Sequence, residues 1–159
     1  MKKLALLYST YTPTIDSIIA HLKDFDVTCL TAPDNLDTYD LVANINYKGE
    51  VKQNHVAVHH SLLPAFESEE PVKDAIIAGV KVTGITFYYT NPKKIITQYP
   101  IFISNASHYD DVAKELEYLE QTIYPLILQR LLENKPFEIR NLLSKGCSGN
   151  CGGCNFCKH

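Results

Sequence analysis

The chain has 159 residues, a formal net charge of −3 and 21% charged residues. This length is that of one domain of ordinary size, which buries a core without disulfide bridges. The slightly acidic balance argues against a dedicated nucleic-acid binder, and no apolar run is long enough to span a bilayer. The basic start, Met1–Lys3, lacks a signal-peptide cleavage region, so we expect a cytoplasmic protein.

The first half of the chain predicts short strands that alternate with helices. Apolar stretches typical of buried strands lie at 3–8, 26–31, 40–45 and 55–59. A helix follows the first of them, with Thr12 as its N-cap and Pro13 at its first position. A second helix is expected over 71–78, and Gly79 ends it.

The second half predicts a hairpin and then one long helix. Residues 81–90 and 94–104 are rich in β-branched and aromatic side chains and flank a short turn. The helix should begin at Ser107, with a capping box between Ser107 and Asp110, and continue to Leu132. Strands that alternate with helices before a hairpin favour an α/β fold with a mixed sheet flanked by helices.

The most informative stretch of the chain is His59-His60-Ser61-Leu62-Leu63-Pro64-Ala65-Phe66. A strand delivers a histidine to its end, and a turn closed by proline follows. Ligands of open α/β sheets gather at the carboxyl ends of strands, so His59 is a site candidate from its position alone. The alternative is a histidine at the surface or at the edge of the core.

Together with Gly79–Thr86 and Ile95–Gln98, this stretch resembles the folate-dependent formyltransferases. The likeness is greatest to phosphoribosylglycinamide formyltransferases and to the amino-terminal domain of methionyl-tRNA formyltransferases. It covers about residues 1–137, including Leu119–Pro125 of the last helix. It implies the Rossmann-like formyltransferase fold and the transfer of formyl from 10-formyltetrahydrofolate to a small-molecule amine.

The resemblance also implies three catalytic groups, an asparagine, a histidine and an aspartate, of which this chain keeps one. The histidine falls on His59, whereas Ala57 stands at the place of the asparagine and His60 at that of the following proline. The loop with the aspartate is replaced by a shorter turn at 90–94. Because loss of one oxyanion donor costs about 10²–10³ in turnover, activity needs substitutes, for which we name His60 and Asn91.

Two binding regions follow from the same resemblance. Folate contacts fall to Ser61, Leu62, Leu63, Pro64, Thr86 and Tyr88. An anion site falls to Ser9, Thr10, Tyr11 and Thr12, where the glycinamide-specific enzymes have a glycine-rich phosphate loop. Hydroxyl groups at a helix N-terminus still attract anions, although a plain threonine cap explains the same residues. Without glycines in this loop, glycinamide ribonucleotide is not the expected acceptor.

The last residues form a separate region. They hold Cys147, Cys151, Cys154 and Cys157, four of the five cysteines. Four thiolates at this spacing suit one [4Fe–4S] cluster or one zinc ion, and a tail with disulfides or free thiols is the remaining alternative. We therefore expect a formyltransferase-like domain at 1–145 and a metal-binding tail at 146–159.

Two functions are compatible with these observations. The first is a formyltransferase altered in substrate or mechanism, with folate and an amine as its small-molecule partners. The second is a non-catalytic module with the same fold, whose tail serves redox sensing, electron transfer or docking of a protein partner. Neither involves nucleic acid or a membrane, and both are compatible with a homodimer.

Overall fold

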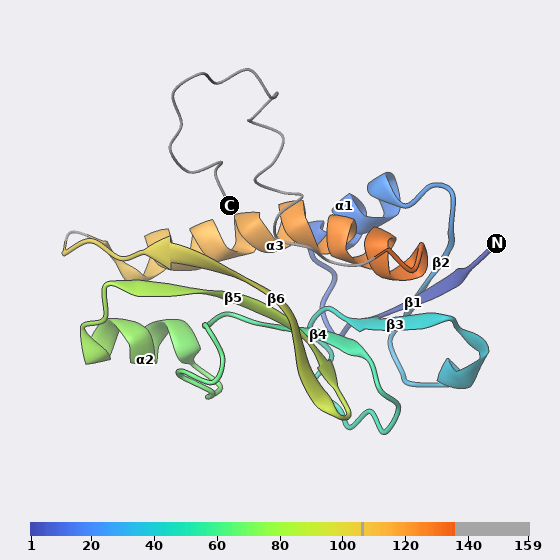
Figure 1. The fold of residues 1–159 in the computed structure, drawn as a ribbon, viewed down its shortest axis with the longest axis horizontal. Helices are drawn as coiled ribbons and strands as arrows, with labels where there is room; N and C mark the ends of the chain where they lie inside the picture. The colour runs from blue at the N-terminus through green and yellow to red at the C-terminus, as the bar shows by residue number, and fades with distance from the viewer. Residues whose placement is uncertain (106, 136–159) are drawn as a thin grey trace, which may run out of the picture.

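The computed structural model describes residues 1–105 and 107–135. A six-stranded sheet has the order β2-β1-β3-β4-β5-β6 (Figure 1). The strands are β1 (Lys3–Leu7), β2 (Asp26–Leu30), β3 (Leu41–Asn44), β4 (Val56–His59), β5 (Val82–Thr90) and β6 (Lys93–Phe102). The helices are α1 (Pro13–His21), the short 3₁₀ helix η1 (Leu36–Thr38), α2 (Pro71–Ala78) and α3 (Tyr109–Leu132). The first four strands pair in parallel and the last two add antiparallel, which confirms the mixed α/β sheet with a long C-terminal helix.

Strand β1 is apolar and buried from Leu4 to Leu7, as expected for an interior strand with both faces covered. Leu4 and Leu6 belong to the main core, which they share with residues of α1, α2 and α3. Ala5 and Leu7 point to the other face and pack in a smaller core beside η1. Helix α3 runs along the sheet in contact with α1 (Figure 1).

The predicted boundaries of α2 are confirmed, whereas the start of α3 differs from its prediction. Helix α2 occupies the expected residues and ends at Gly79, whose φ of 71° is the left-handed conformation that glycine favours. The predicted capping box of Ser107 and Asp110 is wrong by one residue. The Ser107 hydroxyl instead accepts the backbone N–H of Ser104 at 3.1 Å, and Asp111 accepts the backbone N–H of His108.

Tyr124 fixes α3 against the sheet. Its side chain is fully buried, and its hydroxyl lies 3.0 Å from the carbonyl oxygen of Asn44 and 3.2 Å from that of Val56. Its ring packs against Phe87 of β5 with a centroid distance of 5.1 Å. Glu120, one helical turn earlier, is thereby held over the end of β4. No helix in the described ranges has the length and apolar character that crossing a membrane requires.

Candidate functional site

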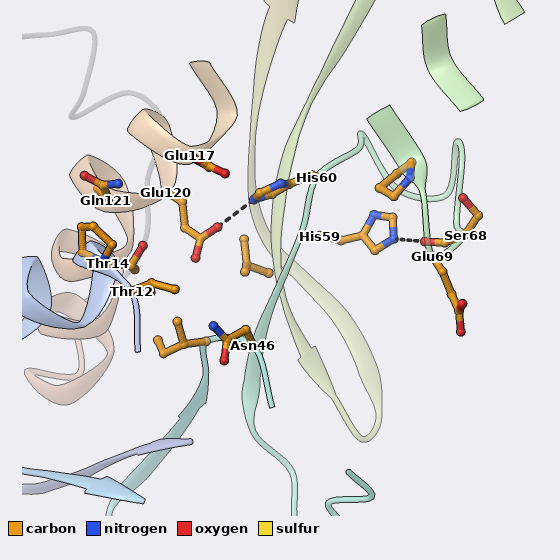
Figure 2. A pocket seen from close by; sticks show the side chains of 14 residues that line it. Thr12, Thr14, Asn46, His59, His60, Ser68, Glu69, Glu117, Glu120 and Gln121 are labelled. Atoms are coloured by element: carbon orange, nitrogen blue, oxygen red, sulfur yellow. Dashed lines mark hydrogen bonds and ion pairs between the residues drawn. The ribbon is translucent and has the colours of Figure 1, made fainter. Parts of the chain in front are cut away.

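A pocket of about 480 Å³ opens at the carboxyl ends of β1, β3 and β4. Its walls come from the start of α1, the residues after β3, the end of β4, the segment before α2, and α3. The lining residues are Thr12, Pro13, Thr14, Ile45, Asn46, Val58, His59, His60, Ser68, Glu69, Pro71, Glu117, Glu120 and Gln121 (Figure 2). Both its size and its place at strand ends are typical of sites for small ligands.

His60 and Glu120 are hydrogen-bonded to each other inside this pocket. The His60 Nε2 atom lies 2.7 Å from the Glu120 Oε2 atom, and the two side chains are 28% and 10% exposed. A carboxylate only accepts, so Nε2 carries a proton, and in the neutral form of the ring Nδ1 holds the lone pair. No hydrogen bond within the described part of the chain occupies Nδ1. An imidazole oriented by a carboxylate in this way is the arrangement of a general base.

His59 points the opposite way, toward Ser68 (Figure 2). Its Nε2 atom lies 3.0 Å from the carbonyl oxygen of Ser68, and its Nδ1 atom lies 2.8 Å from the Ser61 hydroxyl. Burial lowers the pKa of His59, which favours the neutral ring. That ring donates from Nε2 to Ser68 and accepts at Nδ1 from Ser61, so both nitrogens already have partners within the chain.

The residues expected to contact folate, at 61–64, 86 and 88, are not among the described residues that line the pocket. Ser61, Leu63 and Thr86 are buried. The Thr86 hydroxyl donates to the Ser61 carbonyl at 2.7 Å and accepts the Leu63 N–H at 3.0 Å. Gln98 donates to the Leu63 carbonyl at 2.8 Å. These hydrogen bonds stabilise the turn, and the role of its residues as ligand contacts stays a prediction.

The other three expected folate contacts, Leu62, Pro64 and Tyr88, keep some exposure. None of the six residues is among the described residues that line the pocket. The turn that they form nevertheless borders the pocket, because it holds His59 through Ser61.

The expected anion loop is closed by Asn46. The side-chain oxygen of Asn46 accepts the backbone N–H groups of Ser9 and Thr10 at 2.8 and 3.1 Å, and its amide donates to the Thr10 carbonyl at 2.7 Å. Tyr11 turns away and donates its hydroxyl to Asp16. Of the four expected residues, Thr12 alone lines the pocket. The N–H groups of Ser9 and Thr10 are therefore already occupied.

Asn91 lies at the wrong end of β4 for a role beside His59. Strand β5 runs antiparallel to β4 with Tyr89 opposite Val56, so the hairpin turn comes next to the beginning of β4. There the backbone N–H of Asn91 donates to the Asn54 side chain at 2.8 Å. Asn91 is not among the described residues that line the pocket, and its role in catalysis stays an untested prediction.

The predicted metal ligands Cys147, Cys151, Cys154 and Cys157 lie outside the described residues. The boundary predicted between residues 145 and 146 lies there too. The division into domain and tail and the metal site therefore remain predictions. Within residues 1–105 and 107–135, no group of three histidine, cysteine or acidic side chains is arranged to hold a metal ion.

Glu120 and Asn46 are two residues with hydrogen bonds in and beside the site that the sequence did not single out. Glu120 is a charged residue on the buried face of α3, between Leu116 and Ile123. A carboxylate at such a position is rare unless it is paired, and that was the available signal. Asn46 follows the end of β3, where a polar residue at a strand end is a weaker signal.

Comparison with known proteins gives the chain its relatives. The family model described as formyl transferase matches residues 27–128. Phosphoribosylglycinamide formyltransferase of Bacillus subtilis is 37% identical over 83 residues, which are 48% of this chain and 42% of that protein. Formyltetrahydrofolate deformylase of Escherichia coli K12 is 27% identical over 129 residues, 73% of this chain and 42% of that protein. The chain thus spans less than half the length of these curated relatives.

Solved structures agree in fold. Phosphoribosylglycinamide formyltransferase from Bacillus halodurans superposes with a TM-score of 0.69 at 23% identity, over 86% of this chain and 100% of that chain. The enzyme of the same name from Brucella melitensis gives 0.71 at 15% identity, over 82% and 95%. The sheet order and the long last helix described above are therefore those of this fold.

Proposed function

Because the chain belongs to the formyl transferase family, we propose that it transfers the formyl group of 10-formyltetrahydrofolate to an acceptor in the pocket. The observation that carries this proposal is the 2.7 Å pair of His60 and Glu120. It supplies a proton acceptor at the strand end where the family's histidine motif lies. This acceptor takes the place of the aspartate that the shortened turn at 90–94 lacks.

In the proposed reaction, His60 carries the proton of the attacking acceptor to the leaving nitrogen, N10. As the acceptor attacks the formyl carbon, Nδ1 of His60 takes its proton, and Glu120 stabilises the resulting imidazolium through Nε2. The bond from carbon to N10 then breaks, and His60 returns the proton to N10. The products are the formylated acceptor and tetrahydrofolate. The hydroxyls of Thr12 and Thr14 and the amide of Gln121 are the neutral groups on this wall that can donate to the carbonyl oxygen.

The pocket has two sides, as a reaction with two substrates requires. His60, Glu117, Glu120 and Gln121 face one side, and His59 and Ser68 lie on the other (Figure 2). We assign the folate to the His59 side, because the 61–64 turn borders it. The Ser68 carbonyl and the exposed Glu69 carboxylate are acceptors there, and they suit the N–H donors of a pterin ring.

The test is turnover of 10-formyltetrahydrofolate by the full chain, with mass analysis of the products. We expect His60→Asn to lower kcat by about 10²–10⁴, because it removes the base. The matched control is His21→Asn at the far end of α1, which should leave kcat unchanged. If His60→Asn folds normally and turns over like the unmodified protein, the proposal fails.

Hydrolysis is the second candidate, with water as the acceptor. The observation in its favour is that the deformylases align over more of this chain than the phosphoribosylglycinamide formyltransferase does, 73% against 48%. The same base would activate water, and the products would be formate and tetrahydrofolate. Formate as the sole one-carbon product identifies this reaction.

For the tail we propose a separate role. Cys147, Cys151, Cys154 and Cys157 would hold a [4Fe–4S] cluster or a zinc ion for redox sensing, electron transfer or docking of a protein partner. The support is the spacing of the four cysteines within a short glycine-rich segment.

A further inference from the structure

The His60 side of the pocket contains a buried hydroxyl, that of Thr12, which has no hydrogen-bond partner among the described residues. Thr14 is 5% exposed and Glu120 is 7% exposed, and both line the pocket. Glu120 uses only Oε2 for His60. The Oγ1 atom of Thr12 is buried, and no hydrogen bond from the described residues reaches it. Because buried polar groups are almost always hydrogen-bonded, the Thr12 hydroxyl indicates a polar ligand on this side, next to the buried Thr14 and Glu120 side chains.

The charge of the lining selects the ligand further. Three carboxylates, those of Glu69, Glu117 and Glu120, line the pocket, and none of its described lining residues is lysine or arginine. A phosphate group would carry about −1.5 to −2 charges into this acidic surrounding. The side chain of Asn46 also occupies the backbone N–H groups of Ser9 and Thr10, two of the donors that an anion could use at this loop.

From these observations we infer that the acceptor is a phosphate-free amine that carries a second, cationic group, as a short diamine does. This inference rests on the proposed formyl transfer. The neutral amine is placed near Nδ1 of His60. The ammonium group at the other end is placed near Glu117 and the free Oε1 atom of Glu120, where opposite charge stabilises it.

The reaction balances without any further reactant. One amine nitrogen forms a bond to the formyl carbon, and the bond from that carbon to N10 breaks. The proton of the attacking nitrogen moves through His60 to N10. The second amine keeps its charge throughout, and the products are a monoformylated diamine and tetrahydrofolate.

The experiment compares three acceptors of equal chain length with saturating 10-formyltetrahydrofolate and the full chain. They are 1,4-diaminobutane, 4-amino-1-butanol and 4-aminobutyl phosphate, and the readout is kcat/KM for tetrahydrofolate together with the mass of the formylated product. We expect the diamine to exceed the amino alcohol by about fivefold, as one partly exposed ion pair allows. The phosphate should be the poorest acceptor.

A pair of variants tests the assigned residue. Glu117→Lys should reverse the order of diamine and aminobutyl phosphate, whereas Glu115→Lys, on the same helix but outside the pocket lining, should keep it. Equal rates for diamine and amino alcohol, or a preference for the phosphate, overturn the inference and leave formyl transfer standing. If formate is the sole one-carbon product, the inferred amine acceptor is wrong, and hydrolysis of 10-formyltetrahydrofolate is the reaction. If no tetrahydrofolate forms with any acceptor, both the inferred acceptor and the proposed function are wrong.

Discussion

Two adjacent histidines at the end of β4 face different sides of the site. His59 is closed into the turn by Ser61 and Ser68, while His60 reaches Glu120 on α3. Adjacent side chains at a strand end point to opposite faces. His59 therefore stabilises the turn, whereas its neighbour His60 is the proposed base. Ala57, which stands at the place of the family's asparagine, shares the face of His59 rather than that of His60.

The titration of the single residue His59 predicts how the free energy of unfolding depends on pH. Burial lowers its pKa below the ordinary value of 6.5, so the unfolded chain binds the proton more readily than the folded one. The free energy of unfolding should therefore fall as the pH drops from about 6.5 through the lowered pKa of the folded state. Urea unfolding at about pH 7.5 and pH 5.5 measures it. His59→Asn should lose less stability across this range than the unmodified protein, and an identical loss would contradict the assignment.

At the scale of elements, Tyr124 joins α3 to β3 and β4. Tyr124→Phe removes the donor shared by the carbonyls of Asn44 and Val56 in a fully buried place. We expect the free energy of unfolding to fall by about 1–3 kcal/mol. Tyr118→Phe on the same helix is the control, because Tyr118 is 67% exposed, and it should change stability by less than about 0.5 kcal/mol. Urea titration followed by circular dichroism gives both values, and equal effects would refute this role of Tyr124.

The elements themselves were largely predictable from the sequence. Apolar runs predicted the strands, and Pro71 at the start and Gly79 at the end predicted α2. These signals depend only on residues close together in the sequence. The start of α3 was misplaced because the Ser107 hydroxyl is used by Ser104 in the preceding turn. This competition between two nearby partners has no signature in the residue order.

The site was less predictable because it depends on contacts between distant residues. His60 was named from its place in the motif, but its partner Glu120 lies sixty positions later. Asn91 was named because its turn replaces a catalytic loop, yet strand pairing brings that turn to the beginning of β4. Register and helix docking decided both outcomes, and neither can be derived from local patterns.

At the scale of the whole molecule, the four cysteines at 147–157 lead to a prediction of metal binding. If the tail holds metal, anaerobically purified full chain should contain about four iron atoms or about one zinc ion. Elemental analysis and the visible absorption spectrum measure this. Cys151→Ser combined with Cys154→Ser should lose the metal, whereas Cys29→Ser, in β2, should retain it. A metal-free unmodified protein, or equal loss in both variants, would contradict the prediction.

The strand order has a consequence for association. Within the described residues β6 is an edge of the sheet, and an open edge invites pairing with another chain. Lys93, Lys94 and Pro100 lie along this strand, and lysine and proline are the residues that protect edges from such pairing. Growth of the sheet from molecule to molecule through β6 is thereby disfavoured, so a homodimer would form through another surface.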